Sequence, residues 1–76
     1  MNLDRLLVGV ILISNEIGNC PINLLLASGV DCIAVDENGG RFRRRHPSHN
    51  GEEFFLTRDA LQRSHWICVN ENGIVL

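Results

Sequence analysis

Four arginines lie within five positions of this chain, at Arg41, Arg43, Arg44 and Arg45. A guanidinium group binds phosphate or carboxylate oxygens through paired hydrogen bonds, so these residues are a candidate binding surface for a negatively charged partner. The structural alternative is an exposed edge strand that is charged to prevent aggregation. The binding hypothesis requires that the arginines are not neutralised by nearby acidic residues, namely Asp31, Asp36, Glu52 and Glu53.

The cysteines and histidines are the residues that could form a metal site or a catalytic site. Zinc sites usually contain a close C-x2-C pair, which the sequence lacks, and His46 with His49 is the nearest approach to a ligand pair. Cys20, just before Pro21, is the thiol best placed for activation by a helix start, but no base is paired with it in the sequence. We therefore expect neither an enzyme, nor a metal site, nor a cofactor.

Composition narrows the class of protein. With 76 residues and 45% apolar content, the sequence predicts one small domain over residues 1–76. Its net charge of −2 argues against general affinity for polyanions, so contact with nucleic acid would have to be local. Three scattered cysteines do not form a disulfide framework and indicate a reduced, cytoplasmic setting. The apolar run over residues 6–13 is too short to span a bilayer, so no membrane is expected.

The arginines follow the clearest hairpin signal in the chain. Residues 30–35 alternate as a strand does, and Asn38-Gly39 tolerates a tight turn. A two-residue turn at Asn38-Gly39 places Asp36 opposite Arg41, with Arg41, Arg43 and Arg45 on one face and Phe42 on the other. A four-residue turn over residues 36–39, with Gly39 in a bulge, shifts the register by one. The sequence leaves this register open.

Residues 2–17 are the most ambiguous segment. A helix gives an apolar stripe with Asp4, Arg5, Asn15 and Glu16 on the other side, and we favour it. The alternative is a buried central strand over residues 6–13, which is apolar on both faces and rich in β-branched residues.

The remaining segments are predicted to form short helices and short strands that alternate along the chain. Residues 21–28 form a short helix with almost no polar face, which should be buried. After a loop at residues 46–51, residues 54–56 form a strand that enters a helix over residues 58–64 capped by Thr57. Residues 66–69 and 74–76 form a last hairpin about Asn72-Gly73. The prediction is a small α+β domain with short helices packed on β-hairpins.

Residues 10–61 resemble the winged helix-turn-helix modules of excisionase and MerR-type proteins. The turn and second helix of the pair would be residues 17–24, the wing residues 30–45, and the closing unit residues 54–61. This resemblance implies duplex DNA binding, with Asn19 and Asn23 as candidate base readers and the wing arginines Arg41, Arg43, Arg44 and Arg45 on phosphates. The second helix offers few polar side chains for base contacts.

The function that we expect is non-enzymatic DNA binding through the arginine-rich hairpin. The alternative is a protein-protein interaction module of phage or mobile-element character, in which the same arginines contact an acidic protein surface. The apolar residues 74–76 also prompt the hypothesis of a homodimer formed through the C-terminal strand.

Overall fold

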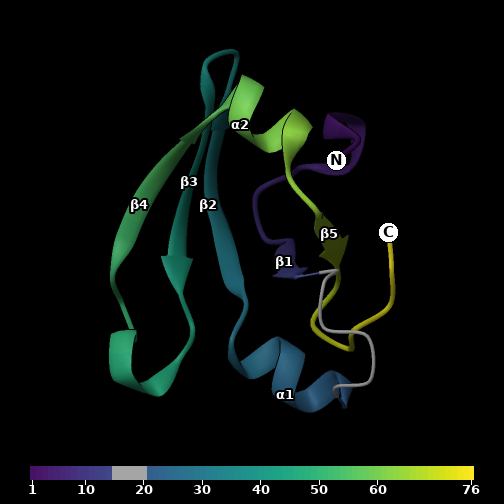
Figure 1. The fold of residues 1–76 in the computed structure, drawn as a ribbon, viewed down its shortest axis with the longest axis vertical. Coiled ribbons are helices and arrows are strands. Elements are labelled where there is room, and N and C mark those ends of the chain that lie inside the picture. Colours follow the sequence, from purple (N-terminus) through teal and green to yellow (C-terminus); the bar gives the residue numbers. More distant parts are fainter. Residues whose placement is uncertain (15–20) are drawn as a thin grey trace.

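The computed structural model describes residues 1–14 and 21–76, which form a small α+β structure around one antiparallel sheet (Figure 1). The five strands in this part of the chain lie in the order β4-β3-β2-β1-β5. The strands are β1 (Ile11–Ser14), β2 (Val30–Asp36), β3 (Gly39–Arg44), β4 (Glu53–Thr57) and β5 (Trp66–Val69). The helices are the α-helices α1 (Ile22–Ala27) and α2 (Arg58–Arg63) and the 3-10 helices η1 (Leu3–Arg5) and η2 (Pro47–His49). The predicted fold class, short helices packed on β-hairpins, is confirmed.

The favoured helix over residues 2–17 is wrong for the part that the structure describes. Residues 3–5 form only the 3-10 helix η1, and β1 lies inside the sheet between β2 and β5. Leu12 and Ile13 are 0% and 3% exposed, as the alternative of a central strand requires. A run that is apolar on all sides suits this position because both faces of the strand are covered. Residues 15–17 lie outside the described residues, and residues 10–14 do not supply the first helix of the proposed helix pair.

The two faces of the sheet are covered unequally. On one face, α2 and the N-terminal segment pack on a cluster that includes Phe42 and Leu61, both fully buried. On the other face, α1 covers only the half formed by β1 and β5, where Leu25 and Leu26 contact Ile11, Ile13 and Val69. The same face of β2, β3 and β4 has no helix over it among the described residues. This uncovered half carries the charged side chains discussed below.

The turn of the β2–β3 hairpin spans residues 36–39, as in the four-residue alternative, but Gly39 lies in the strand pairing and not in a bulge. The register beside the turn differs from the two-residue prediction by two positions and not by one. Asp36 pairs with Gly39, so Glu37 and Asn38 form the turn and the two-residue turn at Asn38-Gly39 is wrong. The Asp36 carboxylate fixes this turn by accepting hydrogen bonds from the backbone N–H groups of Asn38 and Gly39, at 2.7 and 3.1 Å. A bulge between Cys32 and Ala34 then shifts the pairing by one residue, so that Cys32 pairs with Phe42 and Ala34 pairs with Arg41.

Other predicted elements occur where the sequence places them, with one difference in burial. Helix α2 begins after Thr57, whose hydroxyl accepts a hydrogen bond from the N–H of Ala60 at 3.1 Å. Helix α1 is present but not buried, because only one side of it meets the sheet and Ile22 and Leu24 stay exposed. In residues 1–14 and 21–76, no helix has the length and apolar character needed to cross a membrane.

The C-terminal residues cover the outer edge of β5. Val75 forms a bridge with Val69, and the N–H of Leu76 donates to the Cys68 carbonyl at 3.0 Å. The predicted return strand is therefore reduced to a single bridge. Strand β4 forms the opposite edge of the sheet, at the left of Figure 1.

Candidate functional site

The predicted surface is centred on strand β3, where arginines alternate with a buried phenylalanine. Phe42 is 0% exposed, whereas the side chains of Arg41 and Arg43 on the opposite face are 55% and 50% exposed. Arg41 pairs with Phe55 of β4, and Arg43 pairs with Glu53 of β4 and with Asp31 of β2. We call the resulting surface the arginine face. Its residues are Asp31, Arg41, Arg43, Arg45, Glu53 and Phe55.

Every arginine of the arginine face lies near a carboxylate. Arg43 Nη2 is 3.2 Å from Glu53 Oε2, and Arg41 Nη1 is 4.0 Å from Glu53 Oε1. Arg45 Nη1 donates to Asp31 Oδ1 at 2.8 Å. The acidic residues therefore neutralise the arginine face only in part: Arg45 has Asp31 to itself, whereas Arg41 and Arg43 share Glu53. Glu53 serves two guanidinium groups, so this part of the surface keeps an excess of one positive charge.

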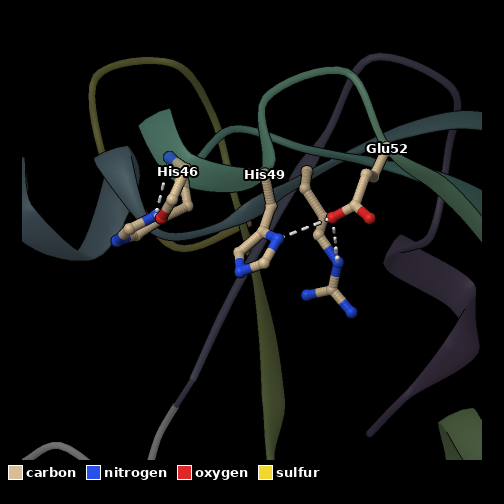
Figure 2. Close-up of polar contacts among 5 residues, drawn as sticks. His46, His49 and Glu52 are labelled. Atoms are coloured by element: carbon tan, nitrogen blue, oxygen red, sulfur yellow. Dashed lines mark hydrogen bonds and ion pairs between the residues drawn. The ribbon is translucent and has the colours of Figure 1, made fainter.

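Arg44 is separated from the other three arginines because it points to the other face of the sheet. Its guanidinium carbon lies 4.7 Å from the centre of the Phe54 ring, and its Nε is 3.9 Å from Glu52 Oε2. The same Glu52 oxygen is 2.8 Å from Nδ1 of His49, and Figure 2 shows the His49 and Glu52 side chains directed at one another. The cluster of four arginines in the sequence is thus divided between two surfaces.

The histidines next to Arg44 belong to a local turn. Nδ1 of His46 lies 2.6 Å from the hydroxyl of Ser48 and accepts a hydrogen bond from its backbone N–H, which caps η2. His46 points away from Glu52 in Figure 2, so no single histidine joins the serine to a carboxylate. The arrangement therefore lacks the relay of a serine nucleophile. Over the described ranges, no group of three or more His, Cys, Asp or Glu could hold a metal ion.

The cysteines that the structure describes are unsuited to nucleophilic chemistry. Cys32 and Cys68 are buried in the core and free of disulfides. Loss of hydration raises the pKa of both thiols, although the contact of Cys32 with the Ala34 carbonyl opposes the rise at that thiol. A thiol with a raised pKa is a weak nucleophile at neutral pH. Cys20, the better candidate from the sequence, lies outside the described residues.

Of the two candidate base readers, the structure describes only Asn23, which does not belong to the arginine face. Asn23 is exposed on α1, which packs on β1 at the lower end of the sheet in Figure 1. Asn19 lies outside the described residues. Beside the Arg45–Asp31 pair, an open cavity of about 310 Å³ is also lined by Asn70 and Glu71. Two carboxylates and one guanidinium make this cavity a poor site for a phosphate.

Phe55 is the residue of the site that the sequence argument did not single out. It is 46% exposed and lies directly opposite Arg41, while its neighbours Phe54 and Leu56 turn toward the core. The alternation of Glu53, Phe55 and Thr57 with these two residues was the available signal. Which of these two sets faces solvent depends on which side of β4 meets the core, and the sequence of β4 does not determine that side.

Comparisons of the chain with protein-family models, with curated proteins and with solved structures each found no match. The geometry of the arginine face and of its edge strand β4 is therefore the basis on which a function can be proposed.

Proposed function

We propose that this chain is a non-enzymatic protein-binding module and that the arginine face is its contact surface. The observation that carries the proposal is the Arg41–Phe55 pair, in which adjacent strands place a half-exposed arginine side chain opposite a half-exposed phenylalanine. Arginine and aromatic residues are enriched at protein interfaces and dominate their binding energy. The ring supplies apolar area, and the guanidinium supplies directional hydrogen bonds.

The charges of the arginine face favour a protein partner over duplex DNA. Affinity for DNA depends on cations in excess, whereas Arg41, Arg43 and Arg45 each lie within 4.0 Å of a carboxylate. The chain as a whole also carries a net charge of −2. Solvent-exposed ion pairs contribute only about 0–1 kcal/mol, so a partner carboxylate can replace Glu53 at small cost. The partner that fits is a protein surface with one acidic side chain beside an apolar group.

The proposal is tested by two double variants that change the charge equally. Arg41→Ala with Arg43→Ala removes the centre of the arginine face, and Arg58→Ala with Arg63→Ala removes two arginines of α2, so both change the net charge from −2 to −4. Proteins captured by the immobilised chain are compared by quantitative mass spectrometry. We expect a partner that the wild type and the α2 variant retain and the face variant loses. Equal capture by all three chains would reject the proposal.

A parallel titration with duplex DNA separates the two hypotheses. Fluorescence anisotropy is measured from about 50 mM salt upward, where phosphate contacts give affinity that falls steeply with salt. We expect no binding that depends on Arg41 and Arg43. Binding whose salt dependence flattens only in the face variant would assign the arginines to DNA instead.

A further inference from the structure

Strand β4 presents an open edge to solvent. It is the last strand of the sheet, and among the described residues β3 is its only strand neighbour. The other edge of the sheet, at β5, is partly covered by Val75 and Leu76. Unpaired edges are usually protected by proline, lysine or a bulge, and residues 53–57 contain none of these. Glu53 is the one charged side chain on this strand.

The backbone groups that β4 directs outward follow from its pairing with β3. The N–H of Arg44 donates to the Glu52 carbonyl at 2.8 Å, and the N–H of Arg58 donates to the Asn38 carbonyl at 3.0 Å. Successive residues of a strand direct their N–H and C=O groups to opposite sides, so even-numbered residues from 52 to 58 face β3. Glu53, Phe55 and Thr57 therefore direct their backbone groups away from the sheet.

The sequence of β4 is complementary to itself in the antiparallel direction. When two copies are centred on Phe55, the two Phe55 residues form a hydrogen-bonded pair, and Glu53 of each copy lies opposite Thr57 of the other. No like charges then face one another across the junction. Glu53 also keeps Arg43 of its own chain as a partner at 3.2 Å. On the other face of the sheet, the half-buried Phe54 of one copy meets Leu56 of the other.

We propose that β4 pairs with β4 of a second copy of this chain, antiparallel and centred on Phe55, so that two five-stranded sheets become one. The two arginine faces then lie on the same side of the joined sheet, with the two Phe55 rings between Arg41 of one copy and Arg41 of the other. The junction is short, so the dimer is expected to be in rapid, concentration-dependent equilibrium with the monomer. Pairing uses the backbone edge of β4 and does not depend on whether the arginine face binds another protein.

Sedimentation equilibrium over a range of concentrations tests the pairing, with two variants at the centre of the junction. Phe55→Pro removes the outward N–H, which β3 does not use, whereas Phe55→Val keeps it. We expect the dimer fraction of the wild type to increase with concentration. The affinity of the dimer should fall by roughly tenfold or less in Phe55→Val, and Phe55→Pro should remain monomeric. A wild type that stays monomeric, or equal association of the two variants, would overturn the proposal.

Site-specific cross-linking gives a second readout that does not require the proline variant to fold. Phe55→Cys and Val35→Cys are each made in a Cys20→Ser background and oxidised; both native residues are exposed, but Val35 lies on the interior strand β2. Paired residues of antiparallel strands have Cα atoms about 5.5 Å apart, within the range of a disulfide. We expect a covalent dimer from Phe55→Cys only. Equal yields from both variants would indicate random collision and contradict the pairing.

Discussion

Arg41 on β3 lies directly opposite Phe55 on β4, and both side chains remain about half exposed on the half of this sheet face that α1 does not cover. The next pair along, Arg43 and Glu53, is joined at 3.2 Å. An arginine side chain that is about half exposed, paired across the strands with a phenylalanine and near one shared carboxylate, retains the capacity to bind. This local mixture of charge and apolar surface is the reason for preferring a protein partner.

Phe42 and Phe55, which lie on opposite faces of the sheet, should differ sharply in their contribution to stability. Phe42→Ala empties a fully buried position and is expected to lower the free energy of unfolding by about 3–5 kcal/mol. Phe55→Ala removes a half-exposed ring and should cost about 1 kcal/mol or less in dilute solution. Urea denaturation followed by circular dichroism measures both. Comparable losses would mean that Phe55 belongs to the core and not to a binding surface.

Because the hairpin approaches β4 closely, replacing Gly39 by alanine should destabilise the fold strongly. Gly39 has a φ of +147°, and a Cβ there would overlap the carbonyl oxygen of Leu56. Gly51 also has a positive φ, at +88°, but a Cβ there would meet nothing within 4 Å. Both alanine variants carry backbone strain, but only Gly39→Ala adds the overlap. We expect Gly39→Ala to be less stable than Gly51→Ala by about 1–3 kcal/mol or more. Thermal unfolding of the two variants provides the comparison, and equal melting temperatures would disprove the overlap.

The start of α2 should depend on the hydroxyl of Thr57. Because that oxygen accepts the N–H of Ala60 at 3.1 Å, Thr57→Ala should destabilise the fold by about 1 kcal/mol. Thr57→Ser keeps an oxygen in place and serves as the matched control. Chemical denaturation of the three chains measures the effect, and a serine variant as unstable as the alanine variant would show that the cap is not the cause.

Stability should fall in alkaline solution because of the two buried thiols. Burial raises the pKa of Cys32 and Cys68 above the value in the unfolded chain, so the neutral thiols favour the folded state. Their contribution is complete below the unfolded pKa and is lost as the pH rises through the folded pKa, that is, above about pH 9. We expect the free energy of unfolding to decline there in the wild type and less steeply in Cys32→Ala with Cys68→Ala. Parallel pH profiles would contradict this prediction.

The sequence predicted those parts of the fold that depend on local patterns. Alternation along β3 correctly predicted that Arg41 and Arg43 point to one face of the sheet and Phe42 to the other. Thr57 correctly marked the start of α2. Local patterns did not decide between helix and strand for the N-terminal segment, because successive residues such as Leu12 and Ile13 are both apolar and so leave no polar face. Its state is decided by β2 and β5, which are distant in sequence and pair with it on both edges.

The ion pairs of the arginine face were also beyond sequence reasoning. Glu53 reaches Arg43 only because β4 returns beside β3 in a register set by the loop through η2. Alternation places Arg44 on the same side of β3 as Phe42, but its contacts with Phe54 and Glu52 depend on where β4 lies. Local alternation therefore identified the candidate residues, and long-range pairing determined which of their charges are balanced.

Residue-resolved amide exchange at increasing protein concentration tests the open edge of β4 most directly, because adjacent amides serve as signal and control. The N–H of Phe54 faces β3 and should be protected at every concentration. The N–H of Phe55 faces outward and should exchange rapidly in dilute solution, then become protected as β4 pairs with a second copy. Protection of Phe55 that does not change with concentration would contradict the account.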